Sequence, residues 1–208
     1  MHLLRRVLVP AAALALLLAA AASAQAPDEG AAARAFAAAA GRVVPAITRA
    51  DVRTTREVNA AATRRACRPA LGGRHSRAAA TLLEVYDLRR LAERLRAPML
   101  RFRGELADAQ TRDPALLSGR AAWRQLGRAL AALPAAGPDP CASVAAWRRG
   151  GFPPAVPRAA QRELDAFGRI AGAAFDRKTE AARARLIELG VPQADAQAFS
   201  GDPSSPAR

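Results

Sequence analysis

The sequence predicts an all-α fold, an up-and-down helical bundle of about four to five helices that carries one disulfide. Ala, a strong helix former, is the most frequent residue, and β-branched residues are sparse. Large apolar residues recur at helical spacing in several segments, and Pro or Gly residues separate these segments. No strand pattern and no internal repeat is visible. These observations exclude a large α/β enzyme, a polytopic membrane protein and a disulfide-dense miniprotein.

The first 24 residues predict a cleaved signal peptide. Arg5 and Arg6 precede an apolar run over 7–22, and residues 22–24 are small, as at a cleavage site. The run is shorter than the about 20 apolar residues that a membrane span needs. The residues after the Arg pair match a twin-arginine signal poorly, so the general secretory route is favoured. We therefore expect export to the periplasm, the cell wall or the medium, and removal of the leader lowers the formal net charge from +14 to +12.

Export bears on the two cysteines, Cys67 and Cys141, which are the only ones in the chain. An oxidising compartment favours a disulfide, and two cysteines allow a single intramolecular pairing. The alternative is a pair of free, buried thiols. Because the core has few large side chains, a bridge across so long a loop would add stability that the core alone lacks.

The mature chain divides into three predicted parts. The Ala-rich segment 25–41 favours helix but buries little, so we expect it to fray. Gly41 and Pro45 are expected to separate it from a helical bundle domain over 42–199. The tail, 200–208, is rich in Gly, Pro and Ser and is expected to be disordered.

Several helices are expected within the bundle domain. A polar helix is predicted over 46–68 and a more apolar one over 76–108, with Ser76 as its cap and Pro98 kinking or breaking it.

Two Asp-Pro pairs mark further helix starts. Asp113-Pro114 predicts a helix that ends near Pro134, and Asp139-Pro140 predicts a short one that ends at Gly150. The longest helix is predicted over 157–189, followed by a short turn through Phe199.

Residues that could carry chemistry are few. His75 is the only histidine of the mature chain, and its glycine-rich loop is typical of a solvated residue. A His-based zinc site is therefore improbable, whereas non-covalent haem ligation by His75, Tyr86 or Met99 stays open. Glu84 and Asp87 lie three residues apart on one helical face, which fits an acid/base pair but fits a salt-bridged surface better. The sequence indicates no cofactor and no catalytic constellation, and we do not expect an enzyme.

The positive charge is concentrated in two acid-free windows. Residues 58–83 contain five arginines and no acid, and residues 140–162 contain four arginines and no acid. Each window holds one cysteine, so a Cys67–Cys141 disulfide would join them, with Trp147 and Phe152 nearby. A third group of arginines, Arg120, Arg124 and Arg128, lies between the two windows in the sequence and on one side of a predicted helix. The candidate anion-binding residues are Arg64, Arg65, Arg68, Arg74, Arg77, Arg148, Arg149, Arg120, Arg124 and Arg128.

Two functions follow as hypotheses. The first is an exported basic protein that binds anionic envelope components, wall polymer or lipid headgroups, through these arginines. A solvated Arg-rich surface, reflecting the codon bias of a GC-rich genome, is the competing interpretation. Export makes a specific nucleic-acid role unlikely, and the sequence leaves the oligomeric state unknown. The second function is carriage of a small apolar ligand between helices, in a pocket lined by Leu88, Leu91, Phe102, Phe167 and Phe175.

Overall fold

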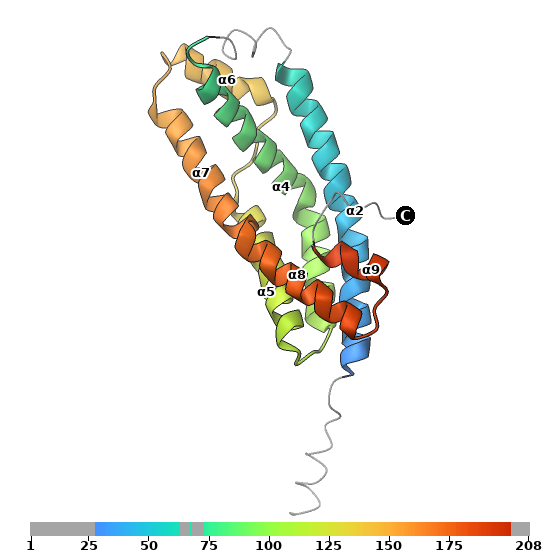
Figure 1. The fold of residues 1–208 in the computed structure, drawn as a ribbon. Coiled ribbons are helices and arrows are strands. Elements are labelled where there is room, and N and C mark those ends of the chain that lie inside the picture. The colour runs from blue at the N-terminus through green and yellow to red at the C-terminus, as the bar shows by residue number, and fades with distance from the viewer. Residues whose placement is uncertain (1–27, 63–66, 68–72, 201–208) are drawn as a thin grey trace, which may run out of the picture.

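The computed structural model describes residues 28–62, 67 and 73–200, and within them the fold is all-α, as predicted (Figure 1). The predicted signal peptide (1–24) and most of the predicted tail (200–208) lie outside the described residues. No helix in the described part of the chain is long and apolar enough to cross a membrane. The elements are α2 (Glu29–Ala62), α4 (Ser76–Asp108), α5 (Pro114–Ala132), α6 (Pro140–Arg149), α7 (Ala155–Ala171), α8 (Ala173–Glu188), α9 (Gln193–Gln197) and the 3-10 helix η1 (Ala198–Ser200).

The long helices α2 and α4 lie side by side along the molecule and define its two ends (Figure 1). At one end, the last turns of α2 and the first turns of α4 lie beside α6 and the start of α7. At the other end, α5, α8, α9 and η1 pack around the start of α2 and the last turns of α4. The cysteines lie at the first of these ends, which we call the disulfide end.

The first helix corrects the predicted break at Gly41 and Pro45, because α2 runs through both. The Ala-rich segment forms its first turns and is buried: Phe36, Ala33 and Ala39 have no exposed surface. Small side chains let α2 approach its neighbours closely, and helices in proteins are stabilised mainly by such packing. That packing offsets the unfavourable effect of an internal Pro. Helix α4 likewise continues through Pro98, where a break was expected.

Both Asp-Pro helix starts are confirmed. The Asp113 carboxylate accepts hydrogen bonds from the backbone N–H groups of Ala115 and Leu116 at the start of α5. The Asp139 carboxylate accepts one from Cys141 N–H at the start of α6. In each case the carboxylate satisfies helix-terminal N–H groups that have no partner within the helix.

The predicted helix over 157–189 is instead two helices, because the chain breaks at Gly172. This glycine has an extended conformation, φ −93° and ψ −157°, between α7 and α8. A Cβ atom at Gly172 would lie 2.6 Å from the Gly168 carbonyl oxygen. Any substitution of Gly172 would therefore have to displace that oxygen. The break directs α8 toward α5 and places Phe199 in the core, where a simple turn had been predicted.

The core has two parts along the bundle. The larger part surrounds Trp123, whose indole packs edge-on against Phe102, Phe175 and Phe199 at centroid distances of 5.0, 5.2 and 6.3 Å. Gly119 permits this closeness, because a Cβ there would come within 2.6 Å of Ala182 Cβ and 2.8 Å of the Phe199 ring. The smaller part lies at the disulfide end and includes both cysteines, Leu82, Leu83, Val144 and Trp147.

Candidate anion-binding site

The predicted Cys67–Cys141 disulfide is present, with the two Cα atoms 5.3 Å apart. It ties the chain that follows α2 to the first turn of α6, across 74 residues of sequence. Both cysteines are buried, at 0% and 1% exposure. The bridge therefore forms part of the smaller core and fixes the position of α6 relative to α2 and α4.

An aromatic stack links the start of α4 to the end of α6. The His75 imidazole lies parallel to the Phe152 ring at 4.1 Å, and the Trp147 indole contacts both edge-on at 5.7 and 5.0 Å. Arg74 Nε donates a hydrogen bond to His75 Nε2. The expectation of a solvated loop histidine is therefore wrong, since His75 is half-buried in a stack. No sequence signal pairs it with Phe152, because the contact depends on how α6 folds back.

The stack places arginines of both predicted windows at one end of the molecule. Arg74 and Arg77 flank His75 at the start of α4, while Arg148 and Arg149 follow Trp147 in the last turn of α6. All four are exposed. We call this group the disulfide-end arginines. The predicted juxtaposition of the two windows thus holds for these four residues, whereas Arg64, Arg65 and Arg68 lie outside the described residues.

The disulfide-end arginines have no carboxylate partner in the described part of the chain, which is also true of other exposed arginines such as Arg101, Arg124 and Arg128. Arg77, Arg148 and Arg149 form no ion pair there, and the Arg74 guanidinium bonds to His75. The stretches left out nearby, 63–66 and 68–72, contain no Asp or Glu. Among the described residues, no carboxylate therefore competes through an ion pair for Arg77, Arg148 or Arg149.

Elsewhere in the bundle, arginines pair with acids. Arg89 makes a two-point contact with Glu163 at 2.7 and 2.6 Å, and Arg42 contacts Glu105 at 2.9 Å. Glu57 accepts from Arg94; although burial alone would raise the pKa of Glu57, the hydrogen bond and charge of Arg94 and the charge of Arg90 lower it. These contacts hold helices to one another, so these arginines are occupied in the fold.

The predicted ridge on α5 is not part of the disulfide end. Arg120 Nη1 donates to the carbonyl oxygens of Leu106 and Ala109, at 3.3 and 3.2 Å, and so satisfies the C-terminus of α4 at the opposite end of the bundle. Arg124 and Arg128 are exposed on the same helix. The inclusion of these three residues in one anion-binding surface is therefore corrected. Periodicity placed them on one ridge but could not show which end of the bundle that ridge occupies.

The residues predicted to line an apolar pocket contribute instead to packing. Phe102 and Phe175 both contact the Trp123 indole, and Leu91 and Phe167 are partly buried against the same core. Leu88 is buried at 9% exposure.

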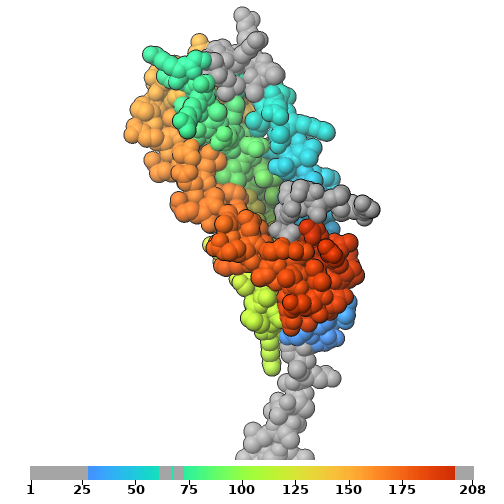
Figure 2. Space-filling view, viewed as in Figure 1, coloured from blue at the N-terminus to red at the C-terminus, as the bar shows by residue number. Residues whose placement is uncertain are grey.

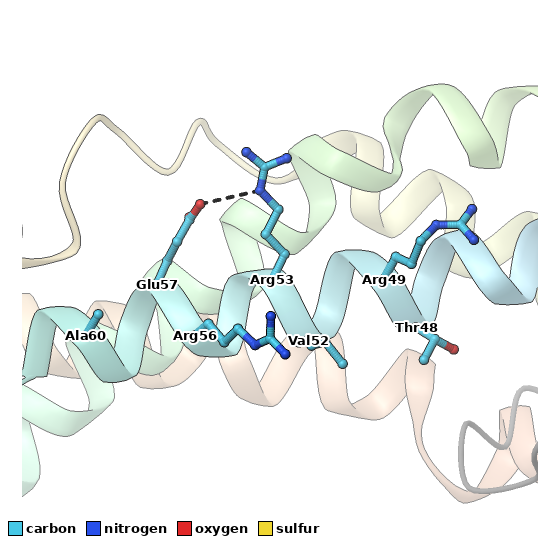
Figure 3. A pocket seen from close by; sticks show the side chains of 7 residues that line it. All are labelled: Thr48, Arg49, Val52, Arg53, Arg56, Glu57 and Ala60. Atoms are coloured by element: carbon cyan, nitrogen blue, oxygen red, sulfur yellow. Dashed lines mark ion pairs between the residues drawn. The ribbon is translucent and has the colours of Figure 1, made fainter.

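A pocket of about 660 Å³ lies elsewhere, along the surface of α2 (Figure 3). Arg53 and Glu57, one turn apart on α2, form an ion pair at 3.8 Å, and the labelled side chains are spread along this helix. None of the five residues predicted for the apolar pocket lines it. The described lining residues are Thr48, Arg49, Val52, Arg53, Arg56, Glu57 and Ala60.

The two carboxylates predicted to share a helical face, Glu84 and Asp87, differ in their environment. Asp87 is partly buried, and burial together with the negative charge of Asp51 raises its pKa, while Arg94 opposes the shift. Its predicted partner, Glu84, is exposed. Among the described residues, no group of three His, Cys, Asp or Glu side chains could hold a metal ion.

The disulfide end thus holds the Cys67–Cys141 bridge and the stack of His75, Phe152 and Trp147. Its arginines Arg77, Arg148 and Arg149 form no ion pair among the described residues. Comparison of the chain with protein-family models, with curated proteins and with solved structures found no match.

Proposed function

We propose that this protein is an exported helical module that binds phosphate- or carboxylate-bearing components of the cell envelope through the disulfide-end arginines. The observation that supports the proposal is that exposed arginines from both acid-free windows gather at one end of the molecule, where three of them have no ion pair among the described residues. Arginines such as Arg42, Arg89 and Arg94 are bound to carboxylates, whereas Arg77, Arg148 and Arg149 have none among the described residues. The two sequence windows that carry these three arginines, 58–83 and 140–162, contain no Asp or Glu.

The chemistry of the guanidinium group suits such ligands. It is always charged, is weakly hydrated compared with an ammonium group, and presents a planar fork of donors that matches phosphate and carboxylate oxygens. The disulfide and the His75–Phe152 stack hold the arginine-bearing segments in fixed relative positions. Less conformational entropy is therefore lost on binding than for arginines on separate loops.

Salt dependence tests this function. Long-chain polyphosphate is a suitable probe, because it presents phosphate oxygens without an apolar phase. If about four arginines bind phosphate, affinity should fall by roughly one to two orders of magnitude between about 50 and 200 mM salt. Titration of the mature protein by calorimetry at several salt concentrations measures the slope. Absence of polyphosphate binding at the lowest salt concentration would contradict the proposed function.

A further inference from the structure

The connection between α6 and α7, together with the first two residues of α7, is apolar and lies beside the disulfide-end arginines. Residues 150–156 carry no charged side chain and no side chain that forms hydrogen bonds. Pro154, Ala155 and Val156 are exposed, with Val156 at 39%, and Phe152 is half-exposed. We call residues 150–156 the apolar loop. It lies beside α6 and the start of α7, at one extremity of the bundle (Figures 1 and 2).

Arginines border the apolar loop on both sides in the sequence. Arg148 and Arg149 precede it, and Arg158 and Arg162 follow it; all four are exposed. No acid occurs between residues 140 and 162. An apolar centre with a cationic border is complementary to an anionic bilayer, whose phosphates lie above a hydrocarbon layer.

Two other exposed apolar residues have a carboxylate neighbour, whereas Leu100, at 55% exposure, has arginine neighbours but lies in the second half of α4, away from the disulfide end. Ile187 has almost the same exposure as Val156, 38%, but Glu188 follows it directly. Val52 is similarly exposed and follows Asp51. A neighbouring carboxylate would be repelled by an anionic membrane surface, so exposure alone does not single out Val156.

Several backbone groups of the apolar loop form hydrogen bonds within the loop or with Trp147. Phe152 N–H donates to the Trp147 carbonyl oxygen, Trp147 Nε1–H donates to the Pro153 carbonyl oxygen, and Val156 N–H donates to the same Pro153 oxygen at 3.3 Å. Phe152 has a positive φ of 60°, rare for a residue with a side chain, and its ring is held against His75. Few polar groups would therefore lose hydrogen bonds on entering the lipid interface, which keeps the cost of desolvation low.

We infer that the disulfide end binds the surface of an anionic bilayer: the apolar loop enters the interface through Val156, and Arg148, Arg149 and Arg158 bind lipid phosphates. The inference rests on the proposed function and names the source of the phosphate. A soluble wall polymer would engage the arginines but offers no apolar phase for the loop.

Sedimentation with vesicles tests the inference. The vesicles are phosphatidylcholine alone or a mixture with phosphatidylglycerol, and long-chain polyphosphate is titrated in parallel. Val156→Asp should weaken binding to the anionic vesicles by about tenfold or more, because it removes an inserted apolar side chain and adds charge repulsion. Ile187→Asp, which makes the same change of charge at a site of equal exposure, should leave vesicle binding nearly unchanged.

A second variant reports insertion without adding charge. The tryptophan of Val156→Trp should be quenched by bromine-labelled lipid, and that of Ile187→Trp should not. Equal vesicle binding by both Asp variants, or equal quenching of both Trp variants, would overturn the bilayer inference. With polyphosphate binding retained, that result would leave the proposed function standing and favour a soluble polymer. If the unmodified protein does not bind polyphosphate, that result would instead contradict the proposed function.

Discussion

Removing the disulfide with the double variant Cys67→Ala/Cys141→Ala should lower the free energy of unfolding by about 4 kcal/mol. The bridge joins residues 74 apart, so its loss frees a long loop in the unfolded chain. Domains of this size are typically stable by only about 5–15 kcal/mol, so the loss is a large fraction of the total. The smaller core would also lose the cross-link around which Val144 and Trp147 pack.

Urea unfolding of the oxidised protein, the reduced protein and the double variant measures this effect. Reductant should destabilise the unmodified protein and leave the double variant unchanged, which separates the bridge from other actions of the reductant. A loss of less than about 1 kcal/mol in the double variant would contradict a stabilising role for the bridge.

Trp123→Ala should lower the free energy of unfolding by about 3–5 kcal/mol, the range for removing a large aromatic side chain from a core. Trp123 is 2% exposed, and three phenylalanine rings pack against its indole. Its Nε1–H also donates to the carbonyl oxygen of Phe199, at 3.2 Å. The variant would open a cavity between α4, α5 and α8 and leave that oxygen without its partner.

Trp123→Phe is the matched control, because it keeps an aromatic ring and removes the indole N–H. Trp123→Phe should lower the free energy of unfolding by less than Trp123→Ala does. The loss that it still causes reflects the missing hydrogen bond and a smaller void. Thermal unfolding followed by circular dichroism compares the two variants. If both had equal, small effects, Trp123 would not be the centre of the larger core.

Local sequence signals predicted much of the fold because their physics is local. An Asp before a Pro satisfies N–H groups two or three residues away, so both starts, at Asp113 and Asp139, were readable. The cysteine pairing was readable by elimination, since only two cysteines exist. The continuity of α2 through Pro45 and of α4 through Pro98, and the break at Gly172, were not readable, because packing against other helices decides whether such residues interrupt a helix.

Some features of the candidate site were likewise predictable from the sequence, and others were not. The two acid-free windows and their cysteines predicted that Arg77 and Arg148 would lie at one end of the molecule. Composition could not show that His75 stacks on Phe152, nor that Arg120 binds carbonyl oxygens of α4. Both contacts join different elements of the fold, and periodicity within one helix carries no information about them.

The most direct test of an anion site at the disulfide end compares two sets of arginines. Arg77→Gln/Arg148→Gln/Arg149→Gln removes three charges at that end. Arg101→Gln/Arg124→Gln/Arg128→Gln removes three exposed arginines from α4 and α5 that likewise have no ion pair in the described part of the chain. At about 1 kcal/mol per arginine near an anionic surface, the first set should weaken binding to anionic vesicles roughly a hundredfold. The second set should weaken it only slightly, whereas equal losses from both sets would show that net charge alone drives binding.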